Sequence, residues 1–433
     1  MSQFRLARLC LVLAAVGLST PALTVHAQDK PAAAAEAAKD TVRPELFKLL
    51  DPAQIKPLMD AKNYAEVQNR VQQAEAFPNR TPYEDYVINR MKLSLGSATG
   101  DNAIAMPALE AVINSGRMQG QEKADFIQAL ANMHYNAKDY PKAIEWFQRY
   151  QKESPTPEKV GPALVRAQYF SKNYAGARDA LLPLIAATEK AGQKPSDEDL
   201  RLLASSANQL KDDAGYLTAL EKLVTYYPSD DYWTDILNRG VARKPGFDAQ
   251  SNMINVYRLE LAAVKQMSAG EYTDLAELAL RDGFPAEAKK AMDAGYAAGV
   301  LGKGSDAKAH GALRDKATKG AADDAKNIAA GEASASKAKT GAGLVNLGWA
   351  YATMDQGDKG VGFIQQGIAK GGLKNPEEAK LRLGMAQVRA GKNADAIQTF
   401  QTVKGGGGAG DLAKYWIVLL QQQQGGAKTA STQ

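Results

Sequence analysis

One stretch of 34 residues decides the fold: ADFIQALANMHYNAKDYPKAIEWFQRYQKESPTP, from Ala124 to Pro157. Apolar or small side chains recur in it at helical spacing. Ile127, Leu130 and Ala131 form one face, and Ala143, Phe147 and Tyr150 form a second. A proline, Pro155, stands where the second helix would have to stop. The spacing predicts two short helices joined by a tight turn.

The same pattern recurs along most of the chain. Tyr174–Ala177 repeats the start of the second helix, and further units begin near residues 197, 269, 341 and 377. The last two units both carry a Leu-Gly pair, at Gly348 and Gly384. These units resemble the tetratricopeptide repeat, a helix–turn–helix unit of about 34 residues. The resemblance covers residues 45–420 and implies an all-α solenoid of helical hairpins wound into a right-handed superhelix; a plain helical bundle is the alternative.

Composition along the chain predicts its division into segments. Asp306–Lys339 is rich in Ala, Lys and Gly, so it is expected to form helices with little buried surface. A glycine run, Gly405–Gly408, precedes a final apolar helix that would cap the open end of the solenoid. The expected segments are a flexible leader at 28–44, a repeat array at 45–302, a degenerate helix pair or linker at 303–340, a repeat pair at 341–404, a capping helix at 409–420 and a polar tail at 421–433.

Residues 1–27 have the three parts of a secretory signal peptide. Arg5 and Arg8 precede the apolar run LCLVLAAVGL, and Val25–Ala27 forms a cleavage signature before Gln28. Cleavage after Ala27 removes Cys10, the only cysteine of the chain, so the mature protein needs no disulfide. We expect a periplasmic protein, with secretion beyond the periplasm as the alternative.

The chemistry of the chain excludes several classes of function. It carries 53 Lys and Arg against 48 Asp and Glu, a net charge of +5. Spread over 433 residues, this charge density is too low for a protein that binds nucleic acid electrostatically. After signal cleavage His134 and His310 are the remaining histidines, too few and too far apart to predict a zinc site. Two Ser-x-x-Lys matches, at Ser305 and Ser334, lack the partner motifs of penicillin-recognising enzymes. The sequence therefore predicts no enzyme, no metal and no cofactor.

Binding to a protein or peptide is the function that remains. In proteins with this repeat, the first helix of each unit lines a concave groove, so the resemblance implies that polar and aromatic residues on those helices contact the partner. Amide side chains can bond an extended backbone, Arg can pair with a carboxylate, and Tyr offers a stacking surface. A solvated groove without a ligand is the alternative. The candidate groove residues are Gln128, Asn132, Tyr135, Arg166, Tyr169, Arg201, Ser205, Asn208, Trp349 and Arg382.

A narrower resemblance concerns the junction YPSDDYW at Tyr227–Trp233 and the segments Lys244–Phe247, Gly343–Gly348 and Gly367–Gly372. It is similar to a group of exported proteobacterial repeat proteins, some of which accompany energy-transducing systems of the TonB type. The resemblance implies a scaffold, with an accessory role in such an envelope transport system and a chaperone-like role toward exported chains as alternatives. The partner would be a protein or a peptide, and one possibility is that the protein associates with an inner-membrane complex.

Overall fold

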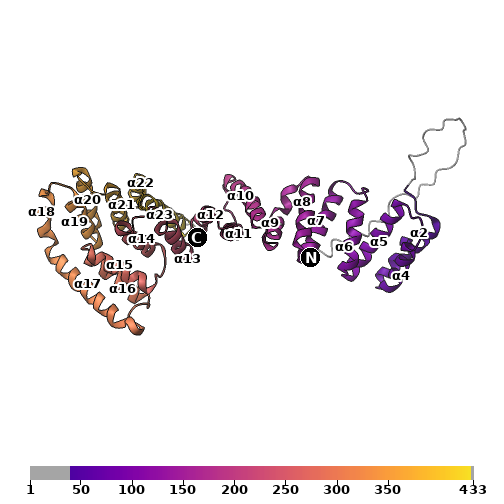
Figure 1. The fold of residues 1–433 in the computed structure, drawn as a ribbon, viewed down its shortest axis with the longest axis horizontal. Coiled ribbons are helices and arrows are strands. Elements are labelled where there is room, and N and C mark those ends of the chain that lie inside the picture. The colour runs from indigo at the N-terminus through magenta and orange to yellow at the C-terminus, as the bar shows by residue number, and fades with distance from the viewer. Residues whose placement is uncertain (1–39, 431–433) are drawn as a thin grey trace, which may run out of the picture. The chain divides into compact units, whose positions relative to one another are not determined.

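The structure, a computed structural model, describes residues 40–430, so the predicted signal peptide lies outside the described residues. Over this range the chain consists of helices and turns without any strand (Figure 1), and the all-α solenoid of helical hairpins is confirmed. The chain divides into two compact units between Leu184 and Ile185, inside α10. This boundary falls within the array that was expected to run unbroken from 45 to 302.

Unit 1 is built from α2 (Pro44–Leu50), α3 (Pro52–Asp60), α4 (Tyr64–Glu75), α5 (Pro82–Thr99), α6 (Asn102–Asn114), α7 (Gly120–Asn136), α8 (Tyr140–Glu153), the 3-10 turn η2 (Pro157–Val160), α9 (Gly161–Phe170) and the first part of α10 (Tyr174–Lys190). Unit 2 contains the rest of α10 and α11 (Asp197–Gln209), α12 (Asp213–Tyr226), α13 (Asp230–Leu237), the π-helical turn η3 (Asn238–Ala242), α14 (Ala249–Ala263), α15 (Ala269–Arg281), α16 (Pro285–Ala297), η4 (Gly304–Asp306), α17 (Ala307–Asn327), η5 (Ile328–Ala330), α18 (Gly331–Lys337), α19 (Ala342–Thr353), α20 (Gly357–Lys370), α21 (Pro376–Arg389), α22 (Asn393–Gln401) and α23 (Ala409–Ala430).

The predicted helix pairs form, and the turns between them share one chemistry. In three hairpins the turn holds a lysine in the left-handed region, Lys138, Lys172 or Lys211, with φ of 60°, 64° and 57°. The next residue caps the second helix: the Asp139 carboxylate, for example, accepts from the Lys142 backbone N–H. A Lys followed by Asp or Asn therefore both ends the first helix and starts the second.

Glycines set the closest helix packing, between α19 and α20. A Cβ atom on Gly348 would lie 2.5 Å from the Gly360 carbonyl oxygen, and one on Gly360 would lie 2.5 Å from the Gly348 oxygen. Gly384 in the next unit faces the ring of Phe400. The Leu-Gly pairs seen in the sequence are thus positions where a side chain would push two helices apart.

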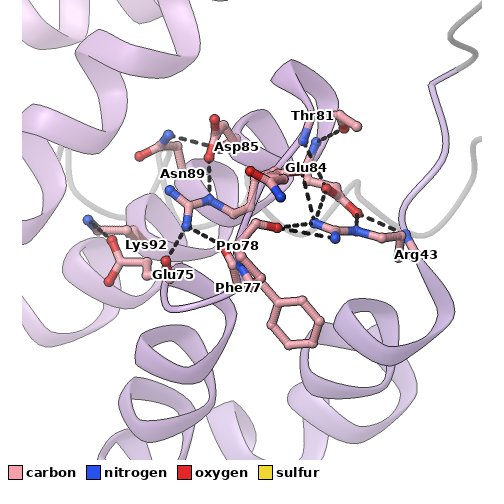
Figure 2. A network of polar contacts seen from close by, with 11 residues as sticks. Arg43, Glu75, Phe77, Pro78, Thr81, Glu84, Asp85, Asn89 and Lys92 are labelled. Carbon is pink, nitrogen blue, oxygen red and sulfur yellow. Dashed lines mark hydrogen bonds and ion pairs between the residues drawn. The ribbon is translucent and has the colours of Figure 1, made fainter.

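A buried carboxylate fastens the start of unit 1 (Figure 2). Arg43 donates two side-chain hydrogen bonds to Glu84, of 2.8 and 2.9 Å, and its backbone N–H donates a third. Glu84 also closes a capping box with Thr81 at the start of α5. The Arg43 side chain, ahead of the Thr81 and Arg43 backbone N–H groups, lowers the pKa of Glu84 to about 2. The network thus joins the residue before α2 to the start of α5.

Unit 2 closes on itself through its last helix. Figure 1 shows α23 beside α14 and α22, which it contacts together with α21 and η3. Lys414 and Tyr415 of α23 both bond to Glu221 of α12, at 2.5 and 2.9 Å. One hydrophobic core runs without a break from Leu220 to Leu420. The expectation of a cap on an open end is therefore corrected: α23 joins the last hairpin to the first helices of the unit, and it continues to Ala430 instead of ending at residue 420.

The Ala-rich segment, expected as a degenerate helix pair or a linker, contains α17 and α18, which follow one another with only η5 between them. α17 packs along α16 and α15, with Ala317 fully buried. His310 of α17 is buried and accepts a hydrogen bond from the Gly302 backbone N–H at 3.2 Å. Small side chains on α17 permit this close contact, as Gly320 against Pro285 illustrates.

Candidate partner-binding site

Unit 2 contains a polar cavity of about 530 Å³ formed by α14, α15, α19 and α21. Three cations and three anions line it together with three amides, one hydroxyl and a single aromatic ring. The lining residues are Asp248, Gln250, Ser251, Arg281, Asp282, Phe284, Asn346, Lys374, Asn375, Glu378 and Arg382. A cavity of this composition suits a polar chain that offers hydrogen bonds and charges of both signs.

Arg382 is the best-positioned of the lining side chains. It donates to Asn346 at 2.8 Å and to Glu378 at 2.7 Å, and its guanidinium lies 5.6 Å from the centre of the Phe284 ring. Its Nε atom is buried and has no partner among the described residues. Burial lowers the pKa of Arg382, against the attraction of Glu378, but a guanidinium stays charged. The cavity therefore has a fixed cation, paired with Glu378, in its wall.

A second cavity of about 580 Å³ adjoins the first, because both are lined by Gln250 and Arg281. Its other walls are more apolar and include Met253, Tyr257 and Leu278. Burial, followed by the hydrogen bond to Asp274, raises the pKa of Tyr257, so its hydroxyl stays protonated and donates. The two cavities together offer an apolar anchor beside a polar pocket.

A buried ionic cluster lies in the interior of the same unit. Arg258 pairs with Glu287 through two hydrogen bonds, of 3.0 and 2.7 Å, and both side chains are at most 3% exposed. Trp349 donates its indole N–H to Glu287 at 3.1 Å. Burial would raise the pKa of Glu287, but the charge and hydrogen bonds of Arg258 outweigh it and lower the pKa. The cluster ties α14, α16 and α19 together.

The structure separates the two candidate residues that the sequence placed in the C-terminal repeats. Arg382 lines the polar cavity, whereas Trp349 is fully buried and forms part of the ionic cluster. Trp349 does not line an open groove because its indole packs under Arg258, 4.6 Å from its guanidinium carbon. Asn346 was missed, although it stands 36 residues before Arg382 at the same repeat position; that spacing was the available signal.

The other candidate residues lie outside the cavities. Gln128, Asn132 and Tyr135 lie on α7, and Arg166 and Tyr169 lie on α9; Asn132 is exposed and the other four are half-buried. Tyr135 and Tyr169 are brought together through two further aromatic rings.

In unit 2, α11 carries three candidates: Arg201, Ser205 and Asn208. Arg201 pairs with Asp197 at 3.3 Å, and its side chain is 65% exposed. Asn208 is exposed and Ser205 is half-buried. Whether these residues contact a partner stays a prediction.

Among residues 40–430, no three His, Cys, Asp or Glu side chains gather in a way that could hold a metal ion. Within the same range no helix is both long and apolar enough to cross a bilayer. His134 is buried and contacts the Asp139 carboxylate at 3.2 Å, so it serves the α7–α8 turn.

Comparison with known proteins supports the repeat class. The sequence profile of the tetratricopeptide repeat family matches residues 378–405, which span most of α21 and α22. The chain therefore carries a tetratricopeptide repeat in its C-terminal part, and repeats of this class typically serve protein–protein interaction rather than catalysis. No curated protein matches the sequence.

Several solved tetratricopeptide repeat structures are similar to the chain at low identity. The TPR2AB domain of yeast Sti1 in its pHSP90 complex is 15% identical, covering 70% of this chain and 100% of that one, with a TM-score of 0.23. Yeast Tom70 is 10% identical, with 88% and 96% covered and a TM-score of 0.22. The P58(IPK) TPR domain is 13% identical, with 88% and 99% covered and a TM-score of 0.21. Scores of this size carry no information about a ligand.

Proposed function

We propose that the protein is an exported, non-enzymatic scaffold that binds a segment of a partner protein in the cavities of unit 2. The observation that carries this proposal is the pair of adjoining cavities, one polar around Arg382 and one apolar around Met253 and Tyr257. An extended peptide could place an apolar side chain in one and its polar groups in the other.

Rigid support for the site favours this use. Arg382 is held by Asn346 and Glu378, which come from two neighbouring first helices. Behind them the cluster of Arg258, Glu287 and Trp349 ties α14 and α19, two of the helices that carry the cavity walls, to α16. A pre-formed site lowers the entropy cost of binding.

The periplasm is the proposed location, and the signal-peptide pattern of residues 1–27 supports it. An accessory role in a TonB-type envelope transport system is the narrower version of the proposal, supported by the resemblance at Tyr227–Trp233. A chaperone-like role toward exported chains is the other version.

The experiment is capture of partners from the cell envelope after crosslinking in the living cell, with charge reversals on the cavity rim. Lys374 is exposed and has no ion pair within residues 40–430. Arg281 is 50% exposed and pairs with Asp282 at 2.8 Å. Surface ion pairs contribute little to stability, so we expect reversing both charges to preserve the fold. We expect Lys374→Glu with Arg281→Glu to lower capture at least tenfold. The matched control is Lys319→Glu with Lys326→Glu on α17, which makes the same change of net charge on exposed residues outside the cavities.

The captured proteins distinguish the versions of the proposal. One inner-membrane complex supports the accessory role, and many unrelated exported chains support the chaperone-like role. Equal capture by wild type and the Lys374/Arg281 variant refutes binding at the cavities.

A further inference from the structure

Five aromatic rings form a continuous strip on unit 1. Going along it, the ring centres lie 5.6, 5.5, 5.8 and 5.5 Å apart; the second contact is stacked and the other three are edge-to-face. The rings of this aromatic strip are those of Tyr135, Tyr140, Phe170, Tyr169 and Tyr174. They come from the end of α7, the start of α8, the end of α9 and the start of α10, so the strip follows two consecutive turns of the repeat.

The strip is much more exposed than the packing of unit 1 requires. Phe170 is 50% exposed, whereas Phe126 and Phe147 of the same unit are at most 1% exposed. The four tyrosines are half-buried, so each ring keeps part of its surface in solvent. Single exposed apolar residues are ordinary on a protein surface, but five in mutual contact form a patch of the kind that binds partners.

Two tyrosines of the strip keep a free hydroxyl. Tyr140 and Tyr174 stand 34 residues apart at the same repeat position, and neither hydroxyl makes a hydrogen bond within residues 40–430. Each can therefore donate to a carbonyl oxygen of a bound chain without breaking a contact of the fold.

The turns that carry the strip are basic. Lys138, Lys142 and Lys172 are exposed at the two turns. The acidic residue of the first turn, Asp139, is already engaged with His134 and with the Lys142 backbone N–H. Three lysines against this one carboxylate leave the two turns with a net positive charge, so an acidic partner is favoured.

We propose that the aromatic strip binds an extended, proline-rich and acidic segment of a partner protein. Proline-rich segments adopt the polyproline II helix, which has no internal hydrogen bonds and leaves its carbonyl oxygens free for the Tyr140 and Tyr174 hydroxyls. Proline rings pack against aromatic side chains, and the preformed helix loses little entropy on binding. Acidic residues between the prolines would pair with Lys138, Lys142 and Lys172. This surface lies in unit 1, so it is independent of the cavities of unit 2.

The test is isothermal titration of the full chain at low salt with a ten-residue peptide of alternating Glu and Pro. Matched peptides replace every Pro by Gly or every Glu by Lys. We expect the Glu-Pro peptide to bind at least tenfold more tightly than either. Phe170→Ala with Tyr140→Ala should weaken it at least tenfold, whereas Phe47→Ala, a similarly exposed phenylalanine on α2 (43%), should leave it unchanged.

A second variant keeps the test valid if the aromatic double variant folds poorly. Lys142 is exposed in the first turn of α8, where an acidic side chain is favourable, so we expect Lys142→Glu to leave the fold intact. This variant should bind the Glu-Pro peptide more weakly and the Lys-Pro peptide more tightly. Absence of binding by the wild type at millimolar peptide overturns the proposal, and so does equal affinity for the Glu-Pro and Glu-Gly peptides. A wild-type dimer in sedimentation that Phe170→Ala dissociates assigns the strip to a second copy instead.

Discussion

Two glycines on one helix should respond in opposite ways to the same substitution. Gly360 and Gly362 both lie inside α20. A Cβ on Gly360 would meet backbone atoms, the Gly348 oxygen at 2.5 Å and the Ala352 nitrogen at 2.9 Å, and such atoms cannot move aside as a flexible side chain could. A Cβ on Gly362 would meet nothing within 4 Å.

The magnitudes follow from these contacts. Overpacking against a backbone costs about 3 kcal/mol, at the upper end of its usual range, and Ala in place of Gly returns about 1 kcal/mol of helix propensity. Gly360→Ala should therefore lower the free energy of unfolding by about 2 kcal/mol, while Gly362→Ala should raise it by about 1 kcal/mol.

The assay is urea unfolding followed by tryptophan fluorescence. Three of the four tryptophans lie in unit 2, so in a Trp146→Phe background the signal reports on that unit alone. The two variants should differ by about 3 kcal/mol. A Gly360→Ala variant as stable as Gly362→Ala would refute the close packing of α19 on α20.

Three further predictions concern buried carboxylates. Glu84→Gln should lower the free energy of unfolding by about 1–2 kcal/mol at pH 7. Because Arg43 depresses the pKa of Glu84 to about 2, this contribution is lost as the pH falls from about 4.5 toward 2. Acid unfolding of the wild type and the variant checks this. Burial raises the pKa of Glu260 to about 7, so its ionisation destabilises the fold as the pH rises through 7. Glu260→Gln should raise the free energy of unfolding by about 2 kcal/mol at pH 8 and hardly change it at pH 5. Urea unfolding at pH 5 and pH 8 measures both differences. Glu287→Gln leaves Arg258 buried without a counter-charge and should lower the free energy of unfolding by about 3–5 kcal/mol. Replacing both partners, Arg258→Met with Glu287→Leu, should cost less stability. An equal loss of stability in the two variants, measured by thermal unfolding, would contradict the role given to the ion pair.

Much of the local fold could be predicted from the sequence because the residues that pack the two helices of a repeat against each other lie within that repeat. The positions of Ala131 and Gly348 follow from the need for small side chains between paired helices. The lysine-led turns were a missed signal: Lys138 and Lys172 each precede a capping Asp or Asn, and together they mark where the hairpins turn.

The arrangement of repeats within unit 2 could not be predicted. A periodic pattern indicates which face of each helix packs on the next helix. The contact of α23 with the first helices of the unit depends instead on the sum of small rotations between successive repeats. Within the Gly405–Gly408 run, the Gly407 carbonyl accepts hydrogen bonds from the Asp248 backbone N–H and from Asn252, which the repeat pattern does not predict. Trp349 and Arg382 come from equivalent helices, and only the closed packing decides that one is interior and the other lines a cavity.

Site-specific photo-crosslinking in the living cell tests the central claim most directly. A photoreactive amino acid at Asn375, an exposed residue on the rim of the polar cavity, should crosslink to a discrete partner protein. The same group at Lys326 on α17 should not, and the crosslink at 375 should disappear when Lys374 and Arg281 are reversed in charge. The same crosslinked products from both positions, or a crosslink at 375 that survives the charge reversal, would contradict partner binding in the cavities of unit 2.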